Sequence, residues 1–298
     1  MTNAAQSARS MWMLFEPIHA VTYFAPEARS AFEQAGLRGF WRGYFAGRAA
    51  PLGPAGPAVV TASFFNFAPA FVARAVPGVW ALITPEQAVA TRLAGATEAL
   101  RGLLAGRESE AAAAAGLLWQ VASELDCPGR VLAAANAAVE VPEDSGALGS
   151  GELGSGALGR LWQAATLLRE HRGDGHFAAL AAADIDGCEA VVLRCGLDLR
   201  REDLQPVRGW TDEAWEAALR RLTDRGWIGA DGALTSTGRD AHAAVEDATD
   251  RAAARPWARL GPETTAEVAK VLTPLAQACA RVLPYPSPIG VPAPGATS

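Results

Sequence analysis

One stretch of the chain, residues 158–240, restricts the fold more than any other, because its last third contains a complete series of short elements. In DEAWEAALRRL the apolar residues recur every three or four positions, which is the spacing of one helix face. The apolar segment RGWI follows, and then the dipeptide Asp231-Gly232, which favours a two-residue hairpin turn. ALTSTGRD comes next and opens another helix. We therefore predict a helix, a short strand, a tight turn, a short strand and a helix in this order.

The composition is that of a globular protein without an evident nucleic-acid face. The chain has 298 residues, enough for about two domains. Half of the residues are apolar and 19% are charged, so a sizeable core can form. The net charge is −6, whereas a nucleic-acid-binding protein usually presents a basic face to the phosphates. Acidity of the whole chain therefore speaks against DNA binding without excluding a local basic surface.

The cysteines and the N-terminal segment predict a cytoplasmic protein. Cys127, Cys188, Cys195 and Cys279 form no CxxC pair, and we interpret them as core thiols in a reducing compartment. The first residues lack the charged and apolar regions of a signal peptide. No apolar run reaches the ~18 residues that a membrane span needs, so no membrane partner is expected.

A near-repetitive segment of Gly, Ser, Ala and Leu divides the chain. It occupies residues 142–159 and has no periodicity of a core element, so we predict a flexible linker there. Residues 1–141 are then a helical domain rich in aromatic residues. Residues 160–283 are a second domain, which contains the hairpin and the C-terminal helices. Residues 284–298 are a proline-rich, extended tail.

Proline, glycine and threonine mark helix boundaries. Pro17 predicts a break in the first helix, and Thr211 is expected to cap the helix that contains DEAWEAALRRL. Gly39, Gly43 and Gly47 recur every fourth residue within an otherwise helical pattern. Because glycine costs ~1 kcal/mol in a helix interior, this stripe predicts that another helix backbone packs closely against it.

LTDRGWI and GALTSTGRDAHAAV resemble the last helix, the wing and the return helix of MarR-type winged-helix proteins. The chain is also similar to a group of uncharacterised actinobacterial proteins with a helix-turn-helix-like domain, through HAVTYFAPEAR, GYFAGRAAPLG, LWQAATLLREHRGDGH and RGWTDEAW. The resemblance implies a mainly α fold, with a helical N-terminal domain and a winged-helix-like C-terminal domain that has a small two-stranded wing. It also implies DNA as a partner and a homodimer as the assembly.

Charge placement opposes DNA reading by this domain. The helix in the recognition position begins with Asp212, Glu213 and Glu216, and this end usually meets base edges and phosphates. The tip of the hairpin carries no Arg or Lys. The connection over residues 196–209 is also longer than the 3–4-residue turn of a helix-turn-helix.

The segment HRGDGH is the densest group of side chains capable of chemistry. His171, Asp174 and His176 could hold a divalent metal, or could pair a base with an orienting carboxylate. The spacing matches no standard zinc site, and the metal and any cofactor stay unknown. The alternative is a turn between two helices, in which Gly173 and Gly175 supply backbone freedom and Asp174 caps the next helix.

The N-terminal domain supplies further candidate residues. His19 and Tyr23 are four residues apart, share a helix face, and could act as acid–base and hydrogen-bond donor. An anion site with an aromatic rim could form from three arginines and two aromatic residues, Arg38, Arg42, Arg48, Trp41 and Tyr44, the alternative being surface arginines beside a packed aromatic stripe. Asn66 lies in the apolar run SFFNFAP and is expected to be buried and hydrogen-bonded, or to contact a ligand. The alternative in each case is a packed aromatic face with satisfied polar ends.

Two functions follow. In the first, the chain is a MarR-like, ligand-responsive transcriptional regulator that binds a small molecule. In the second, it is an enzyme that acts on a small molecule and uses the winged helix as a scaffold. Its site would then lie between the domains and contain His19, Tyr23, Asn66, His171, Asp174 and His176.

Overall fold

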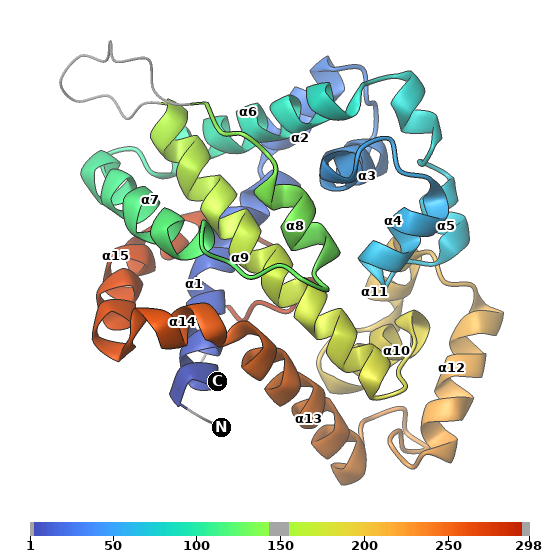
Figure 1. Cartoon of the computed structure of the whole chain (residues 1–298). Coiled ribbons are helices and arrows are strands. Elements are labelled where there is room, and N and C mark those ends of the chain that lie inside the picture. The colour runs from blue at the N-terminus through green and yellow to red at the C-terminus, as the bar shows by residue number, and fades with distance from the viewer. Residues whose placement is uncertain (1–2, 143–154, 294–298) are drawn as a thin grey trace.

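The computed structural model describes residues 3–142 and 155–293, and all regular elements in these ranges are helices (Figure 1). The first part contains α1 (Asn3–Phe24), α2 (Pro26–Gln34), α3 (Phe40–Ala49), η1 (Ala50–Leu52), α4 (Pro57–Phe64), α5 (Pro69–Ala73), η2 (Gly78–Ala81), α6 (Pro85–Leu103), α7 (Glu108–Ala122) and α8 (Val131–Ala137). The second part contains α9 (Ser155–Ala182), α10 (Gly187–Leu197), α11 (Arg201–Arg208), α12 (Asp212–Asp224), α13 (Ser236–Ala253), α14 (Arg255–Leu260) and α15 (Pro262–Ala280).

Helix α9 crosses the middle of the molecule and contacts α1, α6, α7, α8 and α13 (Figure 1). Its residues 161–168, LWQAATLL, are all buried, the polar Gln163 and Thr166 included. A helix that is covered on every side belongs to the interior. Both polar side chains in this run donate a hydrogen bond, Gln163 Nε2 to the Asn136 carbonyl at 2.8 Å and Thr166 Oγ1 to the Trp162 carbonyl at 2.9 Å. Gln163 Oε1 is buried and has no partner in the described structure.

The prediction of a turn at HRGDGH is wrong, because this segment lies inside α9. The glycine at position 175 allows close packing between helices. A Cβ on Gly175 would come 2.8 Å from Arg130 Nη1 and 3.0 Å from the Cβ of Ala252, so glycine lets α13 approach α9 closely. Residues 155–159, predicted as the end of a linker, also belong to α9; the rest of that segment, 143–154, lies outside the described residues.

The first helix is continuous, contrary to the break predicted at Pro17. Helix α1 runs through this proline, and it is fixed in place by α9, α13 and α15, which pack along it. Tertiary packing therefore outweighs the helix-breaking tendency of one proline.

The glycine stripe of α3 accommodates a side chain rather than a helix backbone. A Cβ on Gly47 would come 2.5 Å from Cζ of Phe32, and a Cβ on Gly43 would come 3.0 Å from the same ring. Gly39 lies outside this contact and precedes the helix with a φ of +86°. The predicted close approach exists, but the partner is the Phe32 ring of α2.

Three hydrophobic clusters hold the helices together. The largest contains residues of α1, α6 and α7 together with residues of α9, α14 and α15, and it includes Phe15, Leu118 and Trp162. It therefore draws on both sides of the boundary predicted at residues 142–159. A second cluster joins α2–α5 with parts of α6 and α8, and a third joins the end of α9 with α10–α13. The division into two domains stays a prediction.

The predicted two-stranded wing is wrong, although the mainly α class is right. No strand occurs in the described parts of the chain, and the hairpin is reduced to one isolated antiparallel bridge between Ile228 and Leu234. Gly226, with a φ of +70°, lies just after the end of α12, and Thr235 already caps α13 by accepting a hydrogen bond from the Gly238 N–H at 3.0 Å. Too few residues remain between these two ends for a ladder.

The connection before α12 is also shorter than predicted, because residues 201–208 form α11. Only Gly209, Trp210 and Thr211 join α11 to α12, which is the turn length of a helix-turn-helix. Gly209 has a φ of +74°, and Thr211 caps α12 as predicted, accepting from the Ala214 N–H at 3.2 Å. Helix α10 packs on both of these helices.

Candidate functional site

A cavity of about 880 Å³ lies where the N-terminal helices meet the second half of the chain. Its wall comes from α1, α3, the turn after α4, α9, α10, α11 and α13, and residues 285–293 of the predicted tail cover it. The volume is that of a site for a small organic molecule. The cavity adjoins α11, the helix before the three-residue turn that leads to α12.

The wall of the cavity is rich in arginine. Six arginines line it against five carboxylates, three that line the cavity and two, Glu170 and Asp250, that contact the same arginines, which leaves a formal surplus of one positive charge in a chain whose net charge is −6. The arginines are Arg9, Arg48, Arg169, Arg172, Arg194 and Arg208, and the lining carboxylates are Glu16, Asp198 and Glu246. A concentration of positive charge in a partly open cavity favours an anionic occupant.

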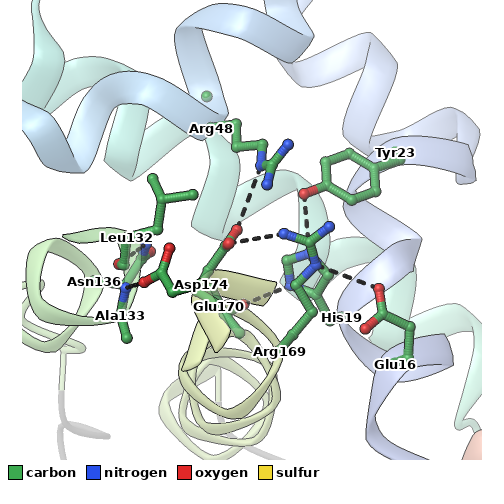
Figure 2. A network of polar contacts seen from close by, with 12 residues as sticks. Glu16, His19, Tyr23, Arg48, Leu132, Ala133, Asn136, Arg169, Glu170 and Asp174 are labelled. Atoms are coloured by element: carbon green, nitrogen blue, oxygen red, sulfur yellow. Dashed lines mark hydrogen bonds and ion pairs between the residues drawn. The ribbon is translucent and has the colours of Figure 1, made fainter. Parts of the chain in front are cut away.

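A chain of buried ion pairs forms one end of the wall (Figure 2). Arg169 of α9 lies between two carboxylates, with Nη1 2.7 Å from Glu170 Oε2 and Nε 3.4 Å from Glu16 Oε1. Arg48 of α3 approaches the other oxygen of Glu170, Nε to Oε1, at the longer distance of 3.4 Å. Tyr44 accepts a hydrogen bond from Arg48 Nη1 at 3.1 Å. Three helices are joined by this network.

The network keeps its carboxylate charged in spite of burial. Burial alone would raise the pKa of Glu170, but the charges of Arg169 and Arg48 lower that pKa to about 2. Burial also works against the charged form of Arg48, whereas Tyr44 and Glu170 hold the pKa of this arginine above its ordinary value. Arg48 and Glu170 are thus a charged pair at neutral pH.

Arg208, the last residue of α11, has no carboxylate partner among the described residues. Its Nη2 donates to the Pro288 carbonyl at 3.0 Å, and its guanidinium lies 4.9 Å from the centre of the Phe67 ring. Burial lowers the pKa of Arg208, and the charges of Arg48 and Arg169 lower it further. Three positive groups therefore act on each other across this part of the cavity.

Four buried polar atoms in the wall have no hydrogen-bond partner in the described structure: Arg48 Nη2, Asn66 Oδ1, Arg194 Nε and Tyr285 Oη. Of these, Arg194 Nε still lies 2.7 Å from Asp198 Oδ1 in an ion pair. Buried polar groups are usually paired, so unpaired ones in a cavity indicate where a bound molecule is recognised. Asn66 follows a strained residue, because Phe65 has a φ of +44° and closes a three-residue turn in which the Asn66 N–H donates to the Phe64 carbonyl at 2.5 Å. Strain of this kind concentrates at functional sites.

A second ion network forms another part of the wall. Asp250 of α13 is fully buried and pairs with Arg172 at 2.6 Å and with Arg9 at 2.6 Å. Glu246, one turn earlier, approaches the same two arginines. His176 Nδ1 lies 3.0 Å from Thr249 Oγ1 and 3.7 Å from Glu246, and burial lowers the pKa of this histidine.

His19 and Tyr23 form a pair, as their spacing indicated, but they line a different space. His19 Nε2 lies 3.0 Å from Tyr23 Oη, and His19 Nδ1 lies 2.9 Å from Thr166 Oγ1 of α9. They border a small cavity of about 30 Å³, whose wall also contains Tyr44 and Arg48. Burial lowers the pKa of His19 well below its usual range, with Arg169 adding to the effect, and burial raises that of Tyr23. Both side chains are neutral at pH 7.

The remaining predicted residues lie away from the large cavity. Asp174 accepts a hydrogen bond from the Ala133 N–H at 3.0 Å and points toward α8 in Figure 2. The His171 carbonyl accepts a hydrogen bond from Arg130, and burial together with this arginine lowers the pKa of the His171 imidazole to about 4. Arg42 is exposed. The structure thus brings Tyr44, Asn66 and His176 to one cavity and separates them from His171, Asp174 and Arg42.

Sequence reasoning missed the arginines of α9 and α11, which supply much of the charge of the cavity. Arg169 and Arg172 lie in LLREHRG, directly after the mostly apolar run LWQAATLL of α9. An arginine within a helix that is buried on all sides must face a partner or a cavity. The sequence around Arg169 and Arg172 therefore contained a signal that these arginines have such a role. Arg208 and Tyr285 carried no comparable signal.

No group of three or more His, Cys, Asp or Glu side chains in the described part of the chain could hold a metal ion. Within the same ranges, no helix is long and apolar enough to cross a membrane.

The described helices define an all-α protein that places a helix-turn-helix beside an arginine-lined cavity. Comparison with known families agrees with this class: residues 8–286 match the Helix-turn-helix family, so the chain belongs to it. No curated protein and no solved structure matches the chain.

Proposed function

We propose that this protein is a DNA-binding regulator of the Helix-turn-helix family whose activity depends on a small molecule bound in the arginine-lined cavity. Family membership over residues 8–286 supports the DNA-binding part. The observation that carries the ligand part is the cavity itself, with its surplus of positive charge and its unpaired polar atoms next to α11.

Direct bonds join the cavity wall to the helix-turn-helix. Trp210, in the turn between α11 and α12, donates from its indole Nε1 to the Asn66 carbonyl at 3.0 Å. The Arg208 carbonyl accepts from the Ala68 N–H at 2.9 Å. A Cβ on Gly209 would overlap the Phe71 side chain, so the turn sits against α5 without spare room. A ligand that moves residues 66–71 would therefore move the turn.

The acidic start of α12 limits how this helix can meet DNA. Arg201 neutralises part of it by pairing with Asp212 at 2.8 Å and with Glu216 at 2.7 Å. Glu213 is exposed and forms no ion pair within the described structure. Arg220 is exposed two turns farther along. The proposal therefore places phosphate contacts at Arg220 rather than at the start of α12.

Fluorescence anisotropy with labelled DNA from upstream of the protein's own gene tests the proposal. A shuffled duplex of equal composition serves as the control, and each is measured at about 50 and 200 mM salt, because phosphate contacts make binding salt-dependent. We expect tighter binding to the upstream duplex. Arg220→Glu should weaken binding and Glu213→Gln should strengthen it. Equal, weak binding of both duplexes with no effect of either substitution would remove the DNA-binding part.

Native mass spectrometry of the protein as purified tests the ligand part. An adduct that disappears on denaturation is expected if the cavity retains its small molecule. A homodimer, which the resemblance implied, would appear in the same spectra as a species of twice the mass.

A further inference from the structure

We propose that the large cavity binds an elongated organic anion, with its anionic group between Arg48 and Arg208 and its apolar body along α9 toward Leu180. The inference rests on the proposed function only in requiring that the cavity accept a small molecule. It adds the chemical class of that molecule and its orientation.

Most of the positive charges in the wall are neutralised by carboxylates and are not free to act on a ligand. Each of the three lining carboxylates is already paired: Glu16 with Arg169, Asp198 with Arg194, and Glu246 with Arg9 and Arg172. Two of the six lining arginines remain without a carboxylate of their own. Arg208 has no carboxylate partner in the described structure, and Arg48 shares Glu170 with Arg169, at 3.4 Å against 2.7 Å for Arg169.

Both of these arginines lie over aromatic rings of the cavity wall. The Arg48 guanidinium lies 4.2 Å from the centre of the Phe64 ring, and the Arg208 guanidinium lies 4.9 Å from that of Phe67. The two rings are neighbours, with centroids 6.4 Å apart. Each guanidinium group thus lies over one of two neighbouring rings. Arg48 Nη2 is buried and has no partner, so it offers an N–H to an incoming acceptor.

The cavity-lining face of α9 changes from charged to apolar along the helix. Its cavity-lining residues are Arg169, Arg172, Gly173, His176, Phe177 and Leu180, which lie on one face at helical spacing. The first two are charged, whereas the last two are apolar and continue into Ile185 and Val191. The ends of this stripe, Arg169 and Leu180, are eleven positions apart, so it spans roughly 17 Å at ~1.5 Å per residue. A ligand that is charged at one end and apolar along its length matches this stripe.

The position of Asn66 adds a requirement at the charged end. Its Oδ1 is buried in the wall without a donor, one residue from Phe67. A hydroxyl or amide N–H near the anionic group of the ligand would satisfy it.

A pair of fluorescent dyes that differ by one charged group tests the inference on the intact protein. 1-Anilinonaphthalene-8-sulfonate carries an anionic group, and N-phenyl-1-naphthylamine is its neutral counterpart. We expect Arg208→Met to weaken the binding of the anionic dye by about tenfold or more, since a hydrogen bond to a charged group is lost. Binding of the neutral dye should change less than about twofold on the same scale.

Matched variants make the result specific. Arg194→Met also removes a lining arginine, but one that Asp198 already neutralises, so it should affect the anionic dye much less than Arg208→Met does. Arg48→Met should act in the same direction as Arg208→Met. Retained binding of the neutral dye shows that a variant still has a folded cavity.

Competition experiments then test the apolar body. Dodecanoate should displace the anionic dye from the unmodified protein, whereas 1-dodecanol and inorganic phosphate should displace it poorly. Equal displacement by dodecanol, or by phosphate alone, would overturn the inference, as would an undiminished affinity of Arg208→Met for the anionic dye. If neither dye binds the unmodified protein, the ligand part of the proposed function fails as well; if only the neutral dye binds, the inference fails alone.

Discussion

The indole N–H of Trp210 donates a hydrogen bond of 3.0 Å to the backbone carbonyl of Asn66. This bond connects the turn of the helix-turn-helix to the strained segment that carries the unpaired Asn66 side chain into the cavity. Trp210 is also held from the side of α11, since Gln205 Nε2 donates to the Trp210 carbonyl at 3.1 Å. The bond therefore joins the proposed ligand site directly to the turn before α12.

Trp210→Phe removes this bond while keeping an aromatic ring. We expect the free energy of unfolding to fall by about 1 kcal/mol, the usual net value of one hydrogen bond. Urea denaturation measures it. The variant should also reduce any effect of cavity ligands on DNA affinity. Trp227→Phe is the matched control, because the Trp227 ring packs against the Arg225 guanidinium outside the cavity. A coupling that survives in Trp210→Phe and is lost in Trp227→Phe would contradict this role.

Glu170→Gln leaves Arg48 and Arg169 in the interior with less counter-charge. Removing one partner of a buried ion pair typically costs about 3–5 kcal/mol. We therefore expect a large loss of stability in thermal or urea unfolding. Glu98→Gln breaks only an exposed pair with Arg101 and should change stability by less than about 1 kcal/mol.

The same network predicts how the unmodified protein responds to acid. The pKa of Glu170 is about 2 in the folded protein, against an ordinary value of 4.5. The stabilisation that this carboxylate provides is therefore complete above pH 4.5 and is lost as the pH falls toward 2. Urea unfolding measured across this range should show the loss, and Glu170→Gln should lack this part of the pH dependence.

Gly187→Ala tests the contact between α10 and the cavity wall. A Cβ at this position would overlap the carbonyl oxygen of Phe65, which belongs to the strained turn before Asn66. Overpacking of this kind costs about 1–3 kcal/mol, and the displaced turn should also weaken dye binding in the cavity. Gly116→Ala in α7 is the control, because a Cβ there meets nothing within 4 Å. That variant should be neutral or more stable by up to about 1 kcal/mol. Equal stabilities of the two variants would show that the Phe65 contact is loose.

Local signals in the sequence predicted local structure well. The α class and the cap at Thr211 follow from periodicity and from side chains that act within one turn of their own position. Pro17 and HRGDGH were misread for the opposite reason. Their conformation is decided by the helices packed around α1 and α9, and no residue near them in sequence reports that packing.

The candidate site was predictable only in part. Tyr44 and Asn66 stood out because a polar group in an aromatic run needs a partner. Arg208 did not stand out, because its importance comes from two distant facts: Phe67 lies beneath it, and no carboxylate in the described chain pairs with it. Such a surplus of charge is a property of a three-dimensional enclosure and has no counterpart in residue spacing.

Asp174→Asn should remove a pH dependence of opposite sign to that of Glu170. Burial raises the pKa of Asp174 from 3.8 to about 6, in spite of the hydrogen bond from the Ala133 N–H. The folded protein therefore binds this proton more tightly than the unfolded chain does, and stability falls as the pH rises from about 3.8 to 6. Asparagine keeps the acceptor oxygen for Ala133 and carries no charge, so at pH 7 the variant should be more stable by about 1–3 kcal/mol. Urea unfolding at pH 4 and pH 7 measures both effects. A variant that is less stable than the unmodified protein at pH 7 would show that the charged carboxylate is the form that the fold requires.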